Sequence, residues 1–237
     1  MPSPGVTRRR NLAAPAASGI AIVGGAQGTQ QHGTGTGVQG TFKQATTAGN
    51  LGIGWVQTAD SATSNPFSVN QGWSVAITQT GSSAYQWSGI IYKADLGSGE
   101  TAPTVTTTDG GSYLAVQLAE FSGAATTSPL HKTGQTSGGG QTISAQCTAA
   151  DTIAKCLIVA AAFWNGGNAP TEMVVTMTDS DSASVTPAGT YYNNSGGITN
   201  ANYWGVAGAV TGSAGDEAAM NDGVYNGSSA CIVSFHP

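Results

Sequence analysis

Histidines, acidic residues and tryptophans are the side chains through which this sequence of 237 residues could do chemistry. An enzyme needs a nucleophile, a base or a set of metal ligands that the fold brings together. His32, His131 and His236 are isolated in the sequence, and none has a partner at the spacing of a metal site. The G-x-S-x-G motif of a serine nucleophile is absent. The sequence therefore predicts no catalytic residue, no metal site and no cofactor.

Two short acidic clusters could offer oxygen ligands to calcium. Asp179 and Asp181 lie in TDSDS, and Asp216, Glu217 and Asp222 form the second cluster. Residues of this type also favour turns between strands, because their side chains bond to nearby backbone groups. We favour the turn interpretation for both clusters.

One glycine-rich stretch formally fits a nucleotide-binding motif. GTGVQG at 35–40 has the spacing G-x-G-x-x-G, but that motif requires a helix after it. The residues that follow, TFKQATT, are typical of a strand. We therefore interpret the stretch as the approach to a first strand.

Exposed aromatic side chains could bind carbohydrate, because sugar rings stack on their faces. Trp55, Trp87 and Trp204 lie within apolar runs and are expected to pack between sheets. Trp73 and Trp164 lie nearer to loops and are the candidates for glycan binding. Packing in the core, or at its rim, is the favoured interpretation for these two as well.

All the arginines stand together near the start of the chain, as Arg8, Arg9 and Arg10 in TRRRN. The net charge is −5, so the rest of the chain carries −8, which argues against nucleic-acid binding by the body. Residues 1–18 have too little apolar bulk to fold alone and are expected to form an extended arm. The leader also resembles a twin-arginine export signal, but we favour a retained arm whose guanidinium groups grip carboxylates of a partner chain.

The fold class follows from short runs rich in Val, Ile, Thr, Tyr and Trp that alternate with Gly, Ser and Asn clusters. The clearest runs are 51–58, 73–80, 87–94, 156–164, 173–179 and 203–210. No long segment has helical periodicity, so we expect an all-β protein built of antiparallel β-sandwiches. No run of about 18 apolar residues exists, and no membrane insertion is expected. Cys147 and Cys156 could form a disulfide across a hairpin, although reduced, buried thiols are the favoured interpretation.

The chain repeats itself in order, which predicts two tandem domains of similar fold. Residues 112–123 match 228–237 with Phe121 against Phe235, 85–101 match 202–217 with Gly89 against Gly205, and 40–55 match 141–161. The predicted organisation is an arm at 1–18, a first β-sandwich at 19–123, a Gly/Ser/Thr-rich linker at 124–136 and a second β-sandwich at 137–237. A single larger sandwich is the alternative.

IIYKADLGSGETAPTVT, followed by LAEFSG, resembles a segment of tandem jelly-roll-type surface proteins of bacteriophage virions. The start of a strand at GNL ahead of a tryptophan is similar too, and the resemblance covers nearly all of the chain after residue 19. It implies jelly-roll-like sandwiches and a structural role as a capsid decoration or minor tail protein, and it transfers no catalytic residue. The weaker second half and the basic leader depart from the family pattern.

From the residues and the resemblance together we expect a non-enzymatic virion protein, assembled in the host cytoplasm and displayed on the particle surface. Its expected partners are a scaffold protein, either the major capsid or a tail protein, and copies of itself in a homo-oligomer. The N-terminal arm is the expected anchor, and no nucleic acid is expected as a partner. The alternative is a glycan-binding adhesion module that recognises a host surface.

Overall fold

The structure is a computed structural model, and it describes residues 19–33, 37–60, 62, 64–81, 85–108, 113–138, 142–165, 174–193, 198–208, 214–221 and 228–237. The all-β prediction is confirmed: the described residues form antiparallel sheets arranged as β-sandwiches, with one short 3₁₀ turn, η1 (Val23–Gly25). No helix in the described part of the chain is long and apolar enough to cross a membrane. The basic leader, residues 1–18, lies outside the described residues.

The first half of the chain forms two sheets. The first inner sheet has the order β1-β9-β4-β7-β6, and β2 also pairs with β9. Its strands are β1 (Ala21–Ile22), β2 (Gln31–Gly33), β4 (Leu51–Ala59), β6 (Ser74–Thr80), β7 (Trp87–Lys93) and β9 (Tyr113–Ser122). The first outer sheet has the order β3-β8-β5. Its strands are β3 (Gly37–Gln39), β5 (Phe67–Val69) and β8 (Thr104–Thr107).

The second half also forms two sheets. The second inner sheet has the order β10-β18-β12-β16-β15, with β10 (Leu130–Gly138), β12 (Leu157–Asn165), β15 (Ala188–Asn193), β16 (Ile198–Val206) and β18 (Ser228–Phe235). The second outer sheet has the order β11-β17-β13-β14, with β11 (Thr142–Gln146), β13 (Val174–Thr178), β14 (Ser184–Val185) and β17 (Glu217–Asn221). No described strand of either half joins a sheet of the other.

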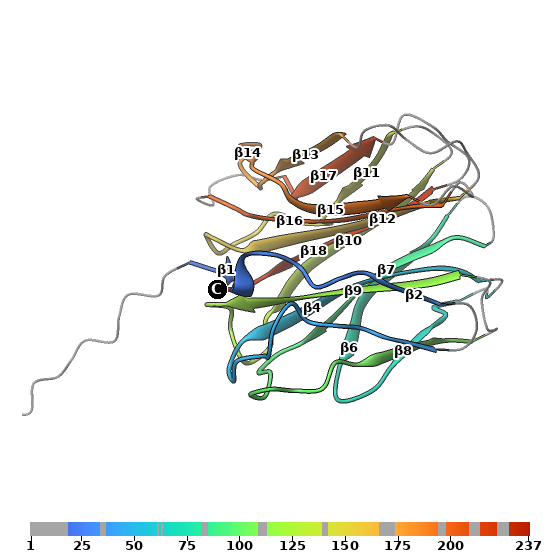
Figure 1. The fold of residues 1–237 in the computed structure, drawn as a ribbon. Helices are drawn as coiled ribbons and strands as arrows, with labels where there is room; N and C mark the ends of the chain where they lie inside the picture. Colours follow the sequence, from blue (N-terminus) through green and yellow to red (C-terminus); the bar gives the residue numbers. More distant parts are fainter. Residues whose placement is uncertain are drawn as a thin grey trace, which may run out of the picture.

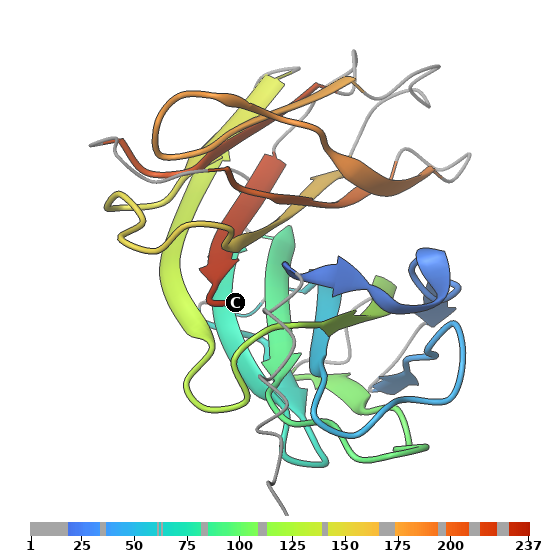
Figure 2. The same cartoon turned by 90° about the vertical axis from the view of Figure 1, so that its left-hand side faces the viewer.

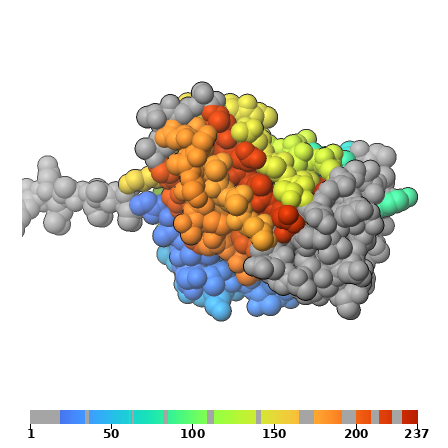
Figure 3. Space-filling view, turned by 90° about the horizontal axis from the view of Figure 1, so that it is seen from above, coloured from blue at the N-terminus to red at the C-terminus, as the bar shows by residue number. Residues whose placement is uncertain are grey.

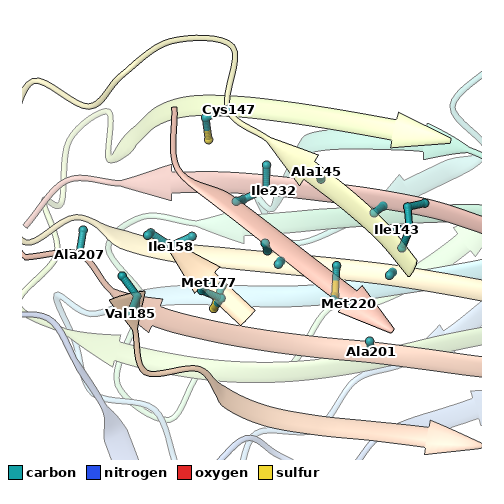
Figure 4. Close-up of a cluster of buried hydrophobic side chains, with 14 of the residues drawn as sticks. Ile143, Ala145, Cys147, Ile158, Met177, Val185, Ala201, Ala207, Met220 and Ile232 are labelled. Atoms are coloured by element: carbon teal, nitrogen blue, oxygen red, sulfur yellow. The ribbon is translucent and has the colours of Figure 1, made fainter. Parts of the chain in front are cut away.

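The four sheets form four layers, with the two inner sheets facing each other (Figures 1 and 2). One apolar core lies within the first half, between its outer and inner sheets, and includes Val56, Phe67 and Val105. A second lies within the second half, where Ile158 and Met177 lie close together (Figure 4).

A third apolar core joins the halves, and we call it the shared core. It contains Leu51, Ile53, Trp55 and Phe121 from the first half and Leu157, Val159, Val233 and Phe235 from the second, all nearly or fully buried. Burying one such side chain contributes about 1.5–3 kcal/mol. The halves are therefore held together by a dry interface like the interior of one domain.

The central strands of both inner sheets are covered on both faces, which explains their near-continuous apolar sequences. Along β12, Leu157 and Val159 point into the shared core, whereas Ile158 and Ala160 point into the second-half core. Period-2 alternation of side chains therefore serves two cores at once. The sequence of such a strand does not show the alternation of apolar and polar residues that is typical of a strand with one solvent-exposed face.

The two halves have the same strand order. Strand by strand, the inner order β9-β4-β7-β6 corresponds to β18-β12-β16-β15. The outer order β3-β8-β5 corresponds in the same way to β11-β17-β13. Phe121 lies opposite Leu51, and Phe235 lies opposite Leu157. The sequence match of the two closing strands therefore falls on equivalent register positions.

The sequence match of residues 85–101 with 202–217 does not follow this register. Gly205 lies opposite Ile158, next to the Leu157 position, and the equivalent residue of β7 is Lys93, opposite Gly52. The alignment of Gly89 with Gly205 is therefore four residues out of register. The glycines at these two positions are unrelated in the structure.

The segment expected to be a linker, 124–136, differs from that expectation in its second part. Residues 130–136 belong to β10, which pairs with β18 along its length. A Cβ atom on Gly134 would lie 1.8 Å from the backbone oxygen of Gln146. Gly134 is thus required because two chain segments approach each other closely there. The composition of residues 130–136 is nevertheless also that of a flexible linker.

Candidate functional site

Two hollows lie side by side where the inner sheets of the two halves meet. The larger, of about 450 Å³, is lined mainly by the first half, including Gln27, Gln30, His32 and Gln117, and by Thr190 of β15. The smaller, of about 160 Å³, lies between η1 and β15 and shares Gln27 and Thr190 with the larger. We call the two hollows together the junction groove. In the space-filling view, atoms of the N-terminal described segment in blue border atoms of the second half in orange (Figure 3).

The floor of the junction groove is a network of side-chain amides from both halves. Gln57 Nε2 donates to Asn202 Oδ1 over 2.5 Å, and Asn202 Nδ2 donates to Gln117 Oε1 over 2.8 Å. The Thr190 hydroxyl lies 2.9 Å from Gln117 Oε1 and 3.2 Å from Gln27 Oε1. Gln117 and Gln27 also donate to backbone oxygens, of Gly28 and Asn202.

Because the network members bind one another, the groove walls are held in fixed positions before any ligand arrives. Gln57, Gln117 and Asn202 are all at least 96 % buried, with exposed fractions of 0, 4 and 0 %. A buried amide that makes its hydrogen bonds is rigid, whereas an unpaired one would cost about 1–3 kcal/mol. This arrangement suits a binding site more than a flexible surface.

A second hydrogen-bonded chain sets the protonation of His32 at one end of the groove. Asn200 Nδ2 donates to the Tyr113 hydroxyl over 2.5 Å, and that hydroxyl lies 2.9 Å from His32 Nδ1. Burial lowers the pKa of His32 below 6.5, so the imidazole is neutral at pH 7. A hydroxyl that accepts from Asn200 has its proton directed at Nδ1, which favours the Nε2–H tautomer of His32.

Trp204 lies in the wall of the smaller hollow. It is half-buried, and it packs edge-on against Phe121 with ring centroids 5.2 Å apart. The other four tryptophans are buried, with exposed fractions of 0–5 %. Trp204, expected to be a core residue, is thus the tryptophan with the most accessible ring.

The two tryptophans predicted to bind glycans lie in the cores. Trp73 packs in the first-half core at 5 % exposure, and Trp164 packs in the second-half core at 2 %. Neither ring offers an open face, and the structure therefore argues against stacking on either. Proximity to a loop in the sequence was a poor guide, because the neighbouring sheet covers the ring.

A buried carboxyl pair lies at one end of the second sandwich. Asp151 and Asp216 are 3 and 0 % exposed, and one oxygen of each, Oδ2, has no hydrogen-bond donor within reach among the described residues. Burial, together with the hydrogen bond and negative charge of Asp151, raises the pKa of Asp216 to about 8. Two carboxylates cannot both stay ionised in such a site, so the pair retains a proton at neutral pH.

The carboxyl pair links several loops. Ser234 Oγ donates to Asp151 Oδ1 over 2.8 Å, and Ser180 Oγ lies 3.1 Å from Asp216 Oδ1. His131 Nε2 lies 3.5 Å from Asp151 Oδ1, but burial and His236 lower the pKa of His131, so the contact is not an ion pair at pH 7. The arrangement binds residues from several segments of the second half together.

The acidic residues predicted as clusters take turn and packing roles in the structure. Asp179 accepts hydrogen bonds from the backbone nitrogens of Asp181, Ala183 and Gly208, and Glu217 accepts one from Ser144. Within the described ranges no three His, Cys, Asp or Glu side chains are placed to hold a metal ion. Asp222 lies outside the described residues.

The remaining predicted residues are separate from the groove. The rings of His131 and His236 are in contact, with centroids 4.2 Å apart and planes tilted by 47°. The three cysteines are free and buried, and burial raises the pKa of each thiol. Arg8, Arg9 and Arg10, the proposed anchor, lie outside the described residues.

The amide network was not predicted from the sequence, although the sequence contains a sign of it. Gln57 and Gln117 interrupt otherwise apolar strand runs, in WVQT and in AVQLAEF. A polar amide in a strand that is buried on both faces needs a hydrogen-bond partner, and here the partner comes from the facing sheet. That partner, Asn202, lies 145 residues from Gln57 and could not be identified from the sequence.

Comparison with protein-family models, curated proteins and solved structures gave no match to this chain.

Proposed function

We propose that this chain is a non-enzymatic structural protein of a bacteriophage virion surface, either a capsid decoration or a minor tail protein. Two jelly-roll-like sandwiches form its body, and the N-terminal arm anchors it to a scaffold protein of the particle. Copies of the chain associate with one another there. The glycan-binding alternative rests on a separate feature, the junction groove.

The strand order supports the jelly-roll part of this proposal. A jelly roll folds eight strands into two sheets through two Greek keys. If β1 and β2 count as the first strand, the first inner sheet joins the first, eighth, third and sixth strands, and the first outer sheet joins the second, seventh and fourth. These are jelly-roll neighbours, except that β6 pairs with β7 and not with β5. The second half follows the same order.

The segment that resembles virion proteins has a structural role here, which fits a structural family. Lys93 Nζ lies 2.5 Å from Glu100 Oε1, and Glu100 Oε2 accepts from the backbone of Gly97 over 2.8 Å. Thr46 Oγ1 donates to the Gly97 carbonyl over 2.7 Å, and Leu96 is buried in the first-half core. The run KADLGSGE is thus a turn held to its own sandwich by hydrogen bonds and one ion pair.

The observation that carries the proposal is the shared core between the two sandwiches. A catalytic or signalling pair of domains usually keeps a mobile interface of modest polarity. Here the interface combines the apolar shared core with buried hydrogen bonds, among them the one that Trp55 Nε1 donates to the Ala160 carbonyl. Such a chain is a rigid block, which suits a building unit of a particle better than a hinged enzyme.

The test is labelling of particles. An antibody raised against the recombinant chain is added to purified particles from the phage or prophage whose genome encodes it, and bound antibody is located by electron microscopy. Labelling at regular positions on capsid or tail supports the proposal, and its absence on intact particles that contain every other structural protein contradicts it.

The anchor is tested separately. Replacing Arg8, Arg9 and Arg10 together with alanine should abolish incorporation into particles at physiological salt, because the guanidinium contacts to carboxylates are lost. The matched control replaces the same three residues with lysine, which keeps the charge but not the bidentate fork. Full incorporation of the alanine variant, with its domains folded, rules the anchoring role out.

A further inference from the structure

The junction groove has the chemistry of a site for an uncharged, hydroxyl-rich ligand. The residues that line its two hollows are amides, hydroxyls, glycines and apolar side chains, together with His32, which is neutral at pH 7. A phosphate or carboxylate ligand needs cationic partners, and a cation needs carboxylates. Neither kind of side chain is among the described residues that line the groove.

The two hollows differ in a way that fits the two kinds of surface of a sugar ring. The smaller one is bounded by the Trp204 ring and by Ile22, Ala26 and Ala188. The larger one presents amide and hydroxyl groups. A pyranose has an apolar face of C–H groups and an equatorial belt of hydroxyls, so one ring can pack on Trp204 while its neighbour makes hydrogen bonds.

One donor in the larger hollow is unsatisfied. Gln30 Nε2 is buried and has no hydrogen-bond partner within the described part of the chain. Gln27 and Gln117, by contrast, use their amide groups within the network. An unpaired buried donor costs free energy that a ligand oxygen would recover.

We propose that the junction groove binds a neutral saccharide chain, with Trp204 as the stacking platform and Gln30 as a hydroxyl-binding amide. This site replaces the two buried tryptophans, Trp73 and Trp164, as the place for the glycan binding considered from the sequence. The inference goes beyond the virion role and does not depend on it. Because both halves line the groove, the site exists only when the two sandwiches are joined.

Tryptophan fluorescence of the full chain gives a direct measurement. Trp204 is the half-buried tryptophan, whereas the other four are buried, so iodide in solution should quench it selectively. A panel of neutral oligosaccharides of glucose, galactose, mannose and N-acetylhexosamines is titrated, with sialylated and phosphorylated sugars as the charged arm. A binding neutral sugar should protect Trp204 from iodide and shift the emission.

Four variants make the test specific. Trp204→Ala should weaken saccharide binding about tenfold or more, and Gln30→Ala about threefold to tenfold, as expected for one lost hydrogen bond. Gln30 makes no bond in the network, so its variant should fold normally, and Trp204→Tyr, which keeps a ring on the shared core, should recover part of the affinity. Tyr85→Ala removes an exposed aromatic ring outside the groove lining and should leave binding unchanged.

Three results would overturn the inference: no neutral saccharide binds at millimolar concentration, only charged sugars bind, or binding is equally strong in the Trp204→Ala and Gln30→Ala variants. None of these results bears on particle labelling, so failure here and failure of the virion role can be told apart.

Discussion

Trp55 and Ala160 are joined by a buried hydrogen bond across the two halves of the chain, 2.9 Å from the indole Nε1 to the carbonyl oxygen. The two residues are 105 positions apart in sequence. Trp55 also packs in the shared core, where its exposed fraction is 0 %. One side chain therefore contributes both apolar area and a directed contact to the joint between the sandwiches.

Loss of this hydrogen bond should be measurable with a matched control. Trp55→Phe is expected to lower the free energy of unfolding by about 0.5–1.5 kcal/mol beyond its packing loss, because one buried hydrogen bond to the Ala160 carbonyl is lost. Trp73→Phe is the control, since Trp73 Nε1 is buried without a partner among the described residues. Denaturant titration gives both values, and an equal loss in the two variants would show that the hydrogen bond contributes nothing.

The shared core also predicts that the two halves unfold together. Separating the sandwiches would expose Leu51, Ile53, Phe121, Val159 and Phe235 to water, so neither half is expected to persist alone. Calorimetry of the full chain should show a single transition whose calorimetric and van't Hoff enthalpies agree. Two resolved transitions would mean that the halves are independent domains.

Much of the strand content could be predicted from the sequence, because Val, Ile, Thr and aromatic residues favour a pleated surface. One strand that the sequence assigned to a linker is β10, whose Thr, Ser and Gly content is also that of a linker. Its strand conformation comes from the ladder that β18 offers, a contact about 100 residues away in the chain. Tertiary pairing decided the conformation there, and local propensity did not.

The candidate site was beyond prediction for a related reason. Trp73, Trp164 and Trp204 all lie in or next to strands, and what separates them is which face another sheet or loop covers. The hollow beside Trp204 is bounded on one side by η1, which is far from Trp204 in the chain. When the other half of the chain covers a strand, the sequence of that strand contains no periodic pattern that reveals it.

The close approach at Gly134 gives a prediction with a control in the same strand. In Gly134→Ala the new Cβ would lie 1.8 Å from the backbone oxygen of Gln146, so β10 and β11 must move apart. We expect a loss of about 2–4 kcal/mol, typical of overpacking that shifts backbone. Among the described residues, the atom nearest to a Cβ at Gly138 is Ser228 Oγ, at 3.7 Å, so Gly138→Ala should change stability by less than about 1 kcal/mol. Thermal melts that place both variants at the same midpoint would contradict this account of β10.

The buried carboxyl pair predicts that its contribution to stability is lost as the pH rises from about 4 to about 8. The folded-state pKa of Asp216 is raised to about 8 from an ordinary value near 3.8, with Asp151 as hydrogen-bond partner and Asp179 as a further nearby negative charge. The folded state therefore holds a proton that the unfolded chain releases. The stability that Asp216 contributes is fully present below pH 4 and is lost as the pH rises through 8, by at most about 1.4 kcal/mol per pH unit. The neighbouring Cys147 and Cys156 stay protonated over this range because burial raises their pKa values.

Asp216→Asn replaces the shared proton with an amide hydrogen aimed at Asp151, so this variant should be more stable than the parent at pH 8 and should show a flatter stability profile from pH 5 to pH 8. Asp95→Asn, at an exposed turn with φ of 55° that asparagine tolerates, should keep the parent's slope. Urea titrations of the three proteins at each pH measure the slopes, and parallel curves for the parent and Asp216→Asn would refute a shared proton.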